Sequence, residues 1–157
     1  MGSAELTRAV LAAEEPAIAA WAARHGWDVH VDHGALTMTA CTQHPAATVP
    51  VMFHADLTGY PVTPPAWTCR TSGGVVSPAA FPVAGNRPGL NGSIFHSSLL
   101  ICAPWSRLAY GTHGGPHAEW ALTSWKAVDG SPTQAHTLAD MLATLALHLS
   151  ASPGLAA

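Results

Sequence analysis

Apolar residues recur along the chain with two periodicities: a helical one near both ends and a strand-like alternation in between. Residues 4–25 carry a helical stripe, and Gly26 is the expected stop, because glycine readily takes the left-handed conformation that ends a helix. Ser3 is the expected N-cap. Pro16 is expected to kink this helix or to divide it in two, because proline cannot donate a backbone hydrogen bond. The apolar stripe consists of Leu6, Val10, Ile18 and Trp21.

A second helix is predicted near the C-terminus. Ser131 and Pro132 are residue types typical of an N-cap and of a first helical position. Pro153 and Gly154 mark the expected end of this helix. Its apolar face consists of Leu138, Met141, Leu142, Leu145 and Leu149.

Four short segments between the helices alternate between apolar and polar residues, which favours β-strands. These predicted strands are residues 27–31, 36–41, 49–54 and 66–70. Their buried positions are expected to include Trp27, Val29 and Val31, then Leu36, Met38 and Ala40. Short turns between the segments favour an antiparallel meander, and residues 71–95 are expected to be irregular. The pattern predicts one α+β domain over residues 1–157: N-terminal helix, four-stranded antiparallel meander, irregular segment and C-terminal helix.

Composition narrows the classes of function. Hydrophobic residues make up 48% of the 157 residues and charged residues 10%, which excludes a disordered chain. Because 6 Lys and Arg residues stand against 9 Asp and Glu residues, no nucleic-acid partner is expected. No apolar run reaches the ~18 residues of a membrane span, and no signal-peptide pattern is found, so no membrane partner is expected. The 3 widely spaced cysteines favour a reducing compartment, and a cytoplasmic protein is expected.

Several motifs resemble those of ubiquitin-conjugating enzymes. Residues 60–65 read Tyr-Pro-Val-Thr-Pro-Pro, which is similar to the YPxxPP element after the third strand in that family. Residues 91–94 (Asn-Gly-Ser-Ile) and 105–106 (Trp-Ser) are similar to the family's NGxI and WSP segments. The order of predicted elements over residues 4–153 also resembles that fold. Residues 102–120 resemble segments of divergent bacterial relatives, which implies work with a bacterial ubiquitin-like modifier.

The chain departs from the family at the position of the catalytic cysteine. In the family a cysteine follows NGxI directly, whereas here Phe95 follows Ile94 and the next cysteine is Cys102. Two arrangements stay open. Either a longer loop makes Cys102 the nucleophile, or Phe95 replaces the nucleophile and the domain is a non-catalytic binding module.

The resemblance implies a transferase that carries a ubiquitin-like modifier on Cys102 as a thioester. It implies two partners, the modifier and an adenylating activating enzyme. Asn91 is the candidate oxyanion donor, and His113 or His117 is the candidate general base. Arg107 and nearby histidines are expected to lower the pKa of the thiol. The alternative is that Cys102 is a buried cysteine that only packs in the core. This is also what we expect of Cys41 and Cys69.

A zinc site is a further alternative. Cys102, His113 and His117 would supply three ligands and leave one coordination position open; otherwise no cofactor is expected. Trp120 and Trp125 are expected in the core. The residues expected to contact a partner are Tyr60, Pro64, Pro65, Trp105, Arg107 and Tyr110.

Overall fold

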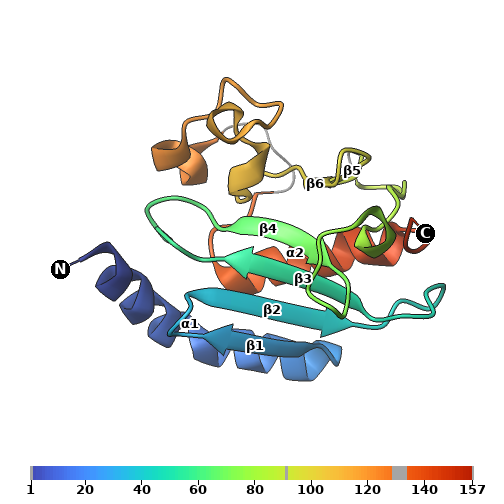
Figure 1. Cartoon of the computed structure of the whole chain (residues 1–157), viewed down its shortest axis with the longest axis horizontal. Helices are drawn as coiled ribbons and strands as arrows, with labels where there is room; N and C mark the ends of the chain where they lie inside the picture. Colours follow the sequence, from blue (N-terminus) through green and yellow to red (C-terminus); the bar gives the residue numbers. More distant parts are fainter. Residues whose placement is uncertain (1, 91, 129–133, 157) are drawn as a thin grey trace.

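A computed structural model describes residues 2–90, 92–128 and 134–156 and has the predicted α+β architecture. A four-stranded antiparallel sheet in the order β1-β2-β3-β4 lies against the two long helices, which share one of its faces (Figure 1). None of the described helices has the length and apolar character needed to cross a membrane. The main elements are α1 (Ser3–His25), β1 (Asp28–Asp32), β2 (Thr37–Thr42), β3 (Val51–Asp56), β4 (Ala66–Arg70) and α2 (Leu138–Ala151).

Helix α1 is one continuous helix through Pro16, so the expected division into two helices is wrong. Pro16 lies on the exposed side, where water can solvate the backbone carbonyl that proline leaves without a donor. The N-cap is Gly2 rather than Ser3, and its backbone N–H donates to the Glu5 carboxylate at 2.8 Å. Gly26 ends the helix with φ 68°, as predicted.

The sheet buries the predicted alternating positions. Met38 and Ala40 are fully buried and Leu36 is 8% exposed, while Trp27, Val29 and Val31 pack against the core from its edge. The inner face continues through Phe53 on β3 and through Trp67 and Cys69 on β4. Cys69 is fully buried, which confirms its packing role, and Cys41 is half-buried.

Helix α2 begins later than the sequence predicts. Thr137 is its N-cap and accepts a hydrogen bond from the Asp140 N–H at 3.2 Å. The expected caps, Ser131 and Pro132, lie outside the described residues, but residues 134–136 are not helical, so a helix start at Pro132 is wrong. The Glu14 carboxylate of α1 accepts hydrogen bonds from the Leu138 N–H at 2.7 Å and from a loop hydroxyl, Tyr60, at 2.6 Å. This carboxylate joins α1, the YPxxPP loop and the start of α2.

The segment between β4 and α2 lies beside β4, at one edge of the sheet (Figure 1). It is less irregular than the sequence suggests, because its described residues form a short antiparallel hairpin and four 3₁₀ helices. Trp105 anchors it on the sheet through an edge-to-face contact with Trp67, with ring centroids 6.1 Å apart. The elements are η1 (Pro78–Ala80), β5 (Phe95–His96), β6 (Leu100–Ile101), η2 (Arg107–Ala109), η3 (Gly111–His113) and η4 (Leu122–Ala127).

Candidate active site

The β5–β6 hairpin returns the chain to its starting point and places Cys102 beside Ile94. Phe95 pairs with Ile101 and His96 with Leu100. One step further, the Cys102 N–H donates to the Ile94 carbonyl at 2.7 Å. The cysteine is therefore adjacent in space to the end of residues 91–94, although residues 95–101 separate the two in sequence.

Cys102 contacts an imidazole that in turn contacts a carboxylate. The Cys102 Sγ lies 3.1 Å from His117 Nε2. On the far side of the ring, His117 Nδ1 lies 2.8 Å from Glu119 Oε1. Because a carboxylate accepts only, Nδ1 carries the proton and Nε2 presents its lone pair to the thiol. The arrangement is that of a nucleophile, a general base and a group that orients the base.

Backbone hydrogen bonds fix the position of His117. Its N–H donates to the Ala109 carbonyl at 3.1 Å, and its carbonyl accepts from the Gly111 N–H at 3.0 Å. Gly115 packs so closely on this turn that a Cβ there would overlap the backbone of Leu108 and Ala109. The glycine is therefore required for the close approach, as expected where two backbone segments touch.

Aromatic packing holds the imidazole ring itself. The rings of His117 and Trp120 are stacked with centroids 3.5 Å apart and planes 3° apart. Trp120 also meets the buried Tyr110 ring edge-on at 5.4 Å. The Tyr110 hydroxyl donates to the Pro104 carbonyl at 2.5 Å, which ties this loop to the residues that follow Cys102. The imidazole therefore has little freedom to swing away from the sulfur.

The electrostatics keep the resting sulfur neutral. Burial of the half-buried Cys102 raises the pKa of its thiol, and the negative charge of Glu119 raises it further. The expected lowering of this pKa is therefore wrong. The hydrogen bond from His117 lowers the pKa of the Glu119 carboxyl, so Glu119 stays ionised. A neutral thiol beside an oriented base loses its proton when it attacks rather than before.

Arg107 serves the fold instead of the thiol. Its guanidinium donates to the carbonyls of Thr58 at 2.8 Å and Asp56 at 3.3 Å. Its backbone N–H donates to the Pro65 carbonyl at 2.8 Å. These bonds attach η2 to the loop that follows β3.

His113 does not join the candidate site. Its side chain is exposed at the end of η3, and its Nδ1 lies 3.3 Å from the Thr112 hydroxyl. Among the residues that the structure describes, no three His, Cys, Asp or Glu side chains are arranged to hold a metal ion. The zinc set of Cys102, His113 and His117 is therefore not assembled.

The other predicted site residues are mostly structural. Asn91 lies outside the described residues. Tyr60, Trp105 and Tyr110 are at most 1% exposed, and Pro64 and Pro65 are buried as well. Their burial argues against direct contact with a partner and assigns them to the fold. Trp125 is 2% exposed, as expected of a core residue, whereas Trp120 is partly buried against His117.

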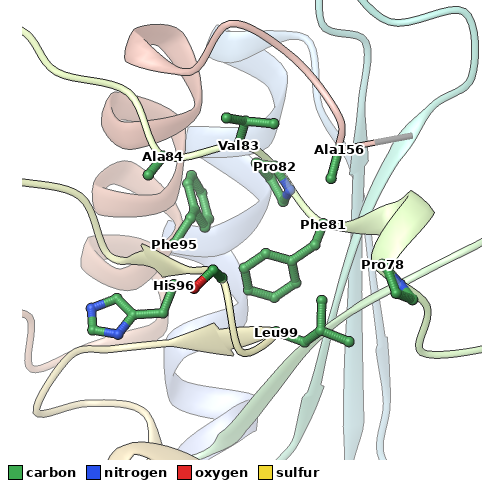
Figure 2. Close-up of a pocket in the computed structure, with 10 residues that line it drawn as sticks. Pro78, Phe81, Pro82, Val83, Ala84, Phe95, His96, Leu99 and Ala156 are labelled. Atoms are coloured by element: carbon green, nitrogen blue, oxygen red, sulfur yellow. The ribbon is translucent and has the colours of Figure 1, made fainter.

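An apolar pocket of about 300 Å³ lies beside the same hairpin (Figure 2). The Phe81 ring sits among its lining residues, and the His96 imidazole points away from that ring (Figure 2). Ala156 also lines the pocket, and its N–H donates to the Phe81 carbonyl at 2.9 Å. The lining includes Phe81, Pro82, Val83, Phe95, Leu99 and Ala156.

Glu119 is the functional candidate that sequence reasoning missed. It stands two positions after His117 and is the single carboxylate in the sequence between residues 92 and 128. Both facts are visible in the sequence, but the pairing depends on the turn at Ala118 and Glu119, which the Trp120 N–H closes by donating to the His117 carbonyl at 3.4 Å.

No family model, no curated protein and no solved structure matches this chain.

Proposed function

We propose that Cys102 is the nucleophile of an acyl-transfer enzyme. The observation that carries the proposal is the relay from the Cys102 Sγ to His117 Nε2 at 3.1 Å and from His117 Nδ1 to Glu119 at 2.8 Å. Partial exposure lets an acyl donor reach the sulfur. His117 takes the thiol proton as the sulfur attacks, and Glu119 stabilises the imidazolium that forms.

The proposed acyl group is the C-terminal carbonyl of a ubiquitin-like modifier. The resemblance to ubiquitin-conjugating enzymes suggests this donor, and the hairpin supports the proposal because it brings Cys102 next to Ile94. Because the Cys102 N–H donates to the Ile94 carbonyl, Cys102 lies opposite the last of the NGxI-like residues, beside the position where the family has its cysteine. Phe95 is a core residue, 1% exposed, stacked on Phe53 at 6.1 Å. Its presence at that position is thus explained by packing and does not require a lost nucleophile.

The proposed transfer has two steps. In the first, the Cys102 sulfur attacks the thioester that joins the modifier to an activating enzyme. The activating enzyme's thiol leaves with the proton that His117 had taken, and the modifier stays on Cys102. In the second, a nucleophile on a target attacks this thioester and releases Cys102. The three free cysteines, Cys41, Cys69 and Cys102, suit a reducing compartment, and we place the reaction in the cytoplasm.

The direct test is to mix the protein with an adenylating activating enzyme, a ubiquitin-like modifier and ATP. We expect an adduct that reductant removes, and in Cys102→Ser a reductant-resistant ester or no adduct. Cys41→Ser is the matched control, because Cys41 is also half-buried but has no imidazole partner among the described contacts. An unchanged thioester in Cys102→Ser would overturn the proposal. Binding of the modifier without any adduct would favour the non-catalytic module.

A further inference from the structure

The His117–Glu119 pair raises the question of which nucleophile it serves. An unprotonated amine attacks a thioester readily without help, because it is already a strong nucleophile. A hydroxyl group is a weak nucleophile and has to lose its proton during the attack, so it needs a general base. A built and oriented base beside an acyl-carrying sulfur is therefore more useful to an oxygen acceptor than to a nitrogen acceptor.

The base stays in place after the sulfur is acylated. Stacking on Trp120 at 3.5 Å and the backbone bonds to Ala109 and Gly111 do not depend on the thiol proton. Once the sulfur carries an acyl group, it has no proton to give to Nε2. The lone pair of Nε2, which lies 3.1 Å from the sulfur, is then free to accept a proton from a group that attacks the acyl carbon.

The charges that flank Cys102 along the chain do not suit a lysine acceptor. A lysine arrives as an ammonium ion, with a pKa near ~10.4, and a site for it needs carboxylates that attract and deprotonate it. Glu119 is the single carboxylate in the sequence from residue 92 to residue 128. Its Oε1 is already engaged by His117 Nδ1 at 2.8 Å. A neutral hydroxyl carries no such requirement.

We propose that the acyl group on Cys102 passes to a hydroxyl group, with water as the acceptor when no alcohol is bound. This inference rests on the proposed function and names the acceptor class for the same site. His117 Nε2 takes the hydroxyl proton while the oxygen attacks the thioester carbonyl. The carbon–sulfur bond then breaks, an ester or a free acid forms, and the departing Cys102 thiolate takes the proton back from His117.

The test uses a synthetic donor and needs no natural partner. The benzyl thioester of acetyl-glycylglycine is exchanged onto Cys102 of the full chain in a Cys41→Ser background, with release of benzyl thiol. The acylated protein is separated from the remaining donor. It is then mixed at pH 7.5 with Nα-acetylserine amide, with Nα-acetyllysine amide, which keeps its side-chain amine free, or with buffer alone. Intact mass and product analysis follow the loss of the acyl group.

We expect discharge to the serine hydroxyl and to water, with little lysine product. His117→Gln should slow discharge to the hydroxyl by roughly 10²- to 10⁴-fold, the usual contribution of a general base, and leave the lysine reaction nearly unchanged. His113→Gln is the control, because His113 is exposed and lies outside the relay, and it should discharge like the parent protein.

The two proposals fail in different ways. If the donor does not load on Cys102, the proposed function itself is wrong. If Cys102 loads but lysine is the faster acceptor, or if His117→Gln leaves the hydroxyl reaction unchanged, only the acceptor class is wrong. Loading followed by no discharge to serine or water also overturns the acceptor class.

Discussion

The interior of the sheet and the base of the β5–β6 hairpin give a cysteine different surroundings. Cys69 lies in the first region and Cys102 in the second. Cys69 is fully buried, and burial raises the pKa of its thiol strongly. Cys102 is half-buried, its pKa is also raised, and an imidazole nitrogen lies 3.1 Å from its sulfur. Burial alone makes a cysteine inert, whereas a buried cysteine beside an oriented base has an acceptor for its proton, which the proposed function requires. The neighbours of a thiol therefore decide its chemistry more than its exposure does.

Removing the proposed base should give the largest change in the rate at which Cys102 is acylated. His117→Gln should slow acylation of Cys102 by a synthetic peptide thioester at pH 7 by about 10²-fold or more, because a general base contributes roughly that much. Cys69→Ala should leave the acylation rate per folded molecule unchanged. Both rates are measured by quenching the reaction at set times and determining the fraction of acylated protein by intact mass spectrometry. Equal rates for His117→Gln and the parent protein would remove His117 from the mechanism.

Gly115→Ala tests how closely the loop positions the base. The added Cβ would overlap the backbone of Ala109 and Leu108, so the turn must shift and carry His117 away from the sulfur. A displacement near 1 Å can reduce a rate by about 10²-fold, and we expect a loss of about 10- to 10²-fold in acylation.

The control for that variant is Gly34→Ala in the turn between β1 and β2. There the new Cβ would meet its nearest neighbour, Asp32 Oδ1, at 3.4 Å. This variant should keep the parent rate and stability. If Gly115→Ala acylated as fast as Gly34→Ala, the packing of the loop would not position the base.

Arg107→Ala tests the attachment of the active-site segment to the sheet. The side chain is 13% exposed and donates to two backbone carbonyls, so we expect a loss of about 2–3 kcal/mol in the free energy of unfolding. Chemical denaturation measures the change. Arg87→Ala is the control: Arg87 is exposed and donates to Ser150 at 3.0 Å, and its loss should change stability by about 0.5 kcal/mol at most.

The smallest effect concerns the pH at which Cys102 reacts. Because burial and the charge of Glu119 raise its pKa, Cys102 of the free protein should be alkylated slowly by iodoacetamide at pH 7, and the rate should rise only at a pH above the usual pKa of a free cysteine. Glu119→Gln removes a negative charge that opposes ionisation of the thiol, so the midpoint of this profile should move to lower pH. Alkylation that is already at its maximum at pH 7 would mean a resting thiolate and contradict the neutral thiol.

The sheet was predictable from local pattern, and the site only in part. Alternation at Met38 and Ala40 marks a buried strand face whatever lies around it. Cys102 and His117 were recognisable by residue type, but choosing His117 over His113 required the path of the loop. The sequence does not predict the hairpin, because the left-handed position of its turn is occupied by Leu99, with φ 62°. A glycine or asparagine at that position would have indicated a turn. The start of α2 was misjudged because Ser131 and Pro132 form as good a start signal as Thr137.

A hairpin lengthens a chain without separating its two ends. If one residue is added to or removed from each strand of the β5–β6 hairpin, Ile94 and Cys102 still lie opposite each other. A search for a cysteine immediately after the isoleucine would pass over a chain of this kind. Searches for other chains with the proposed function should therefore allow a hairpin of variable length at this point and ask which residue lies opposite the isoleucine, not which one comes next.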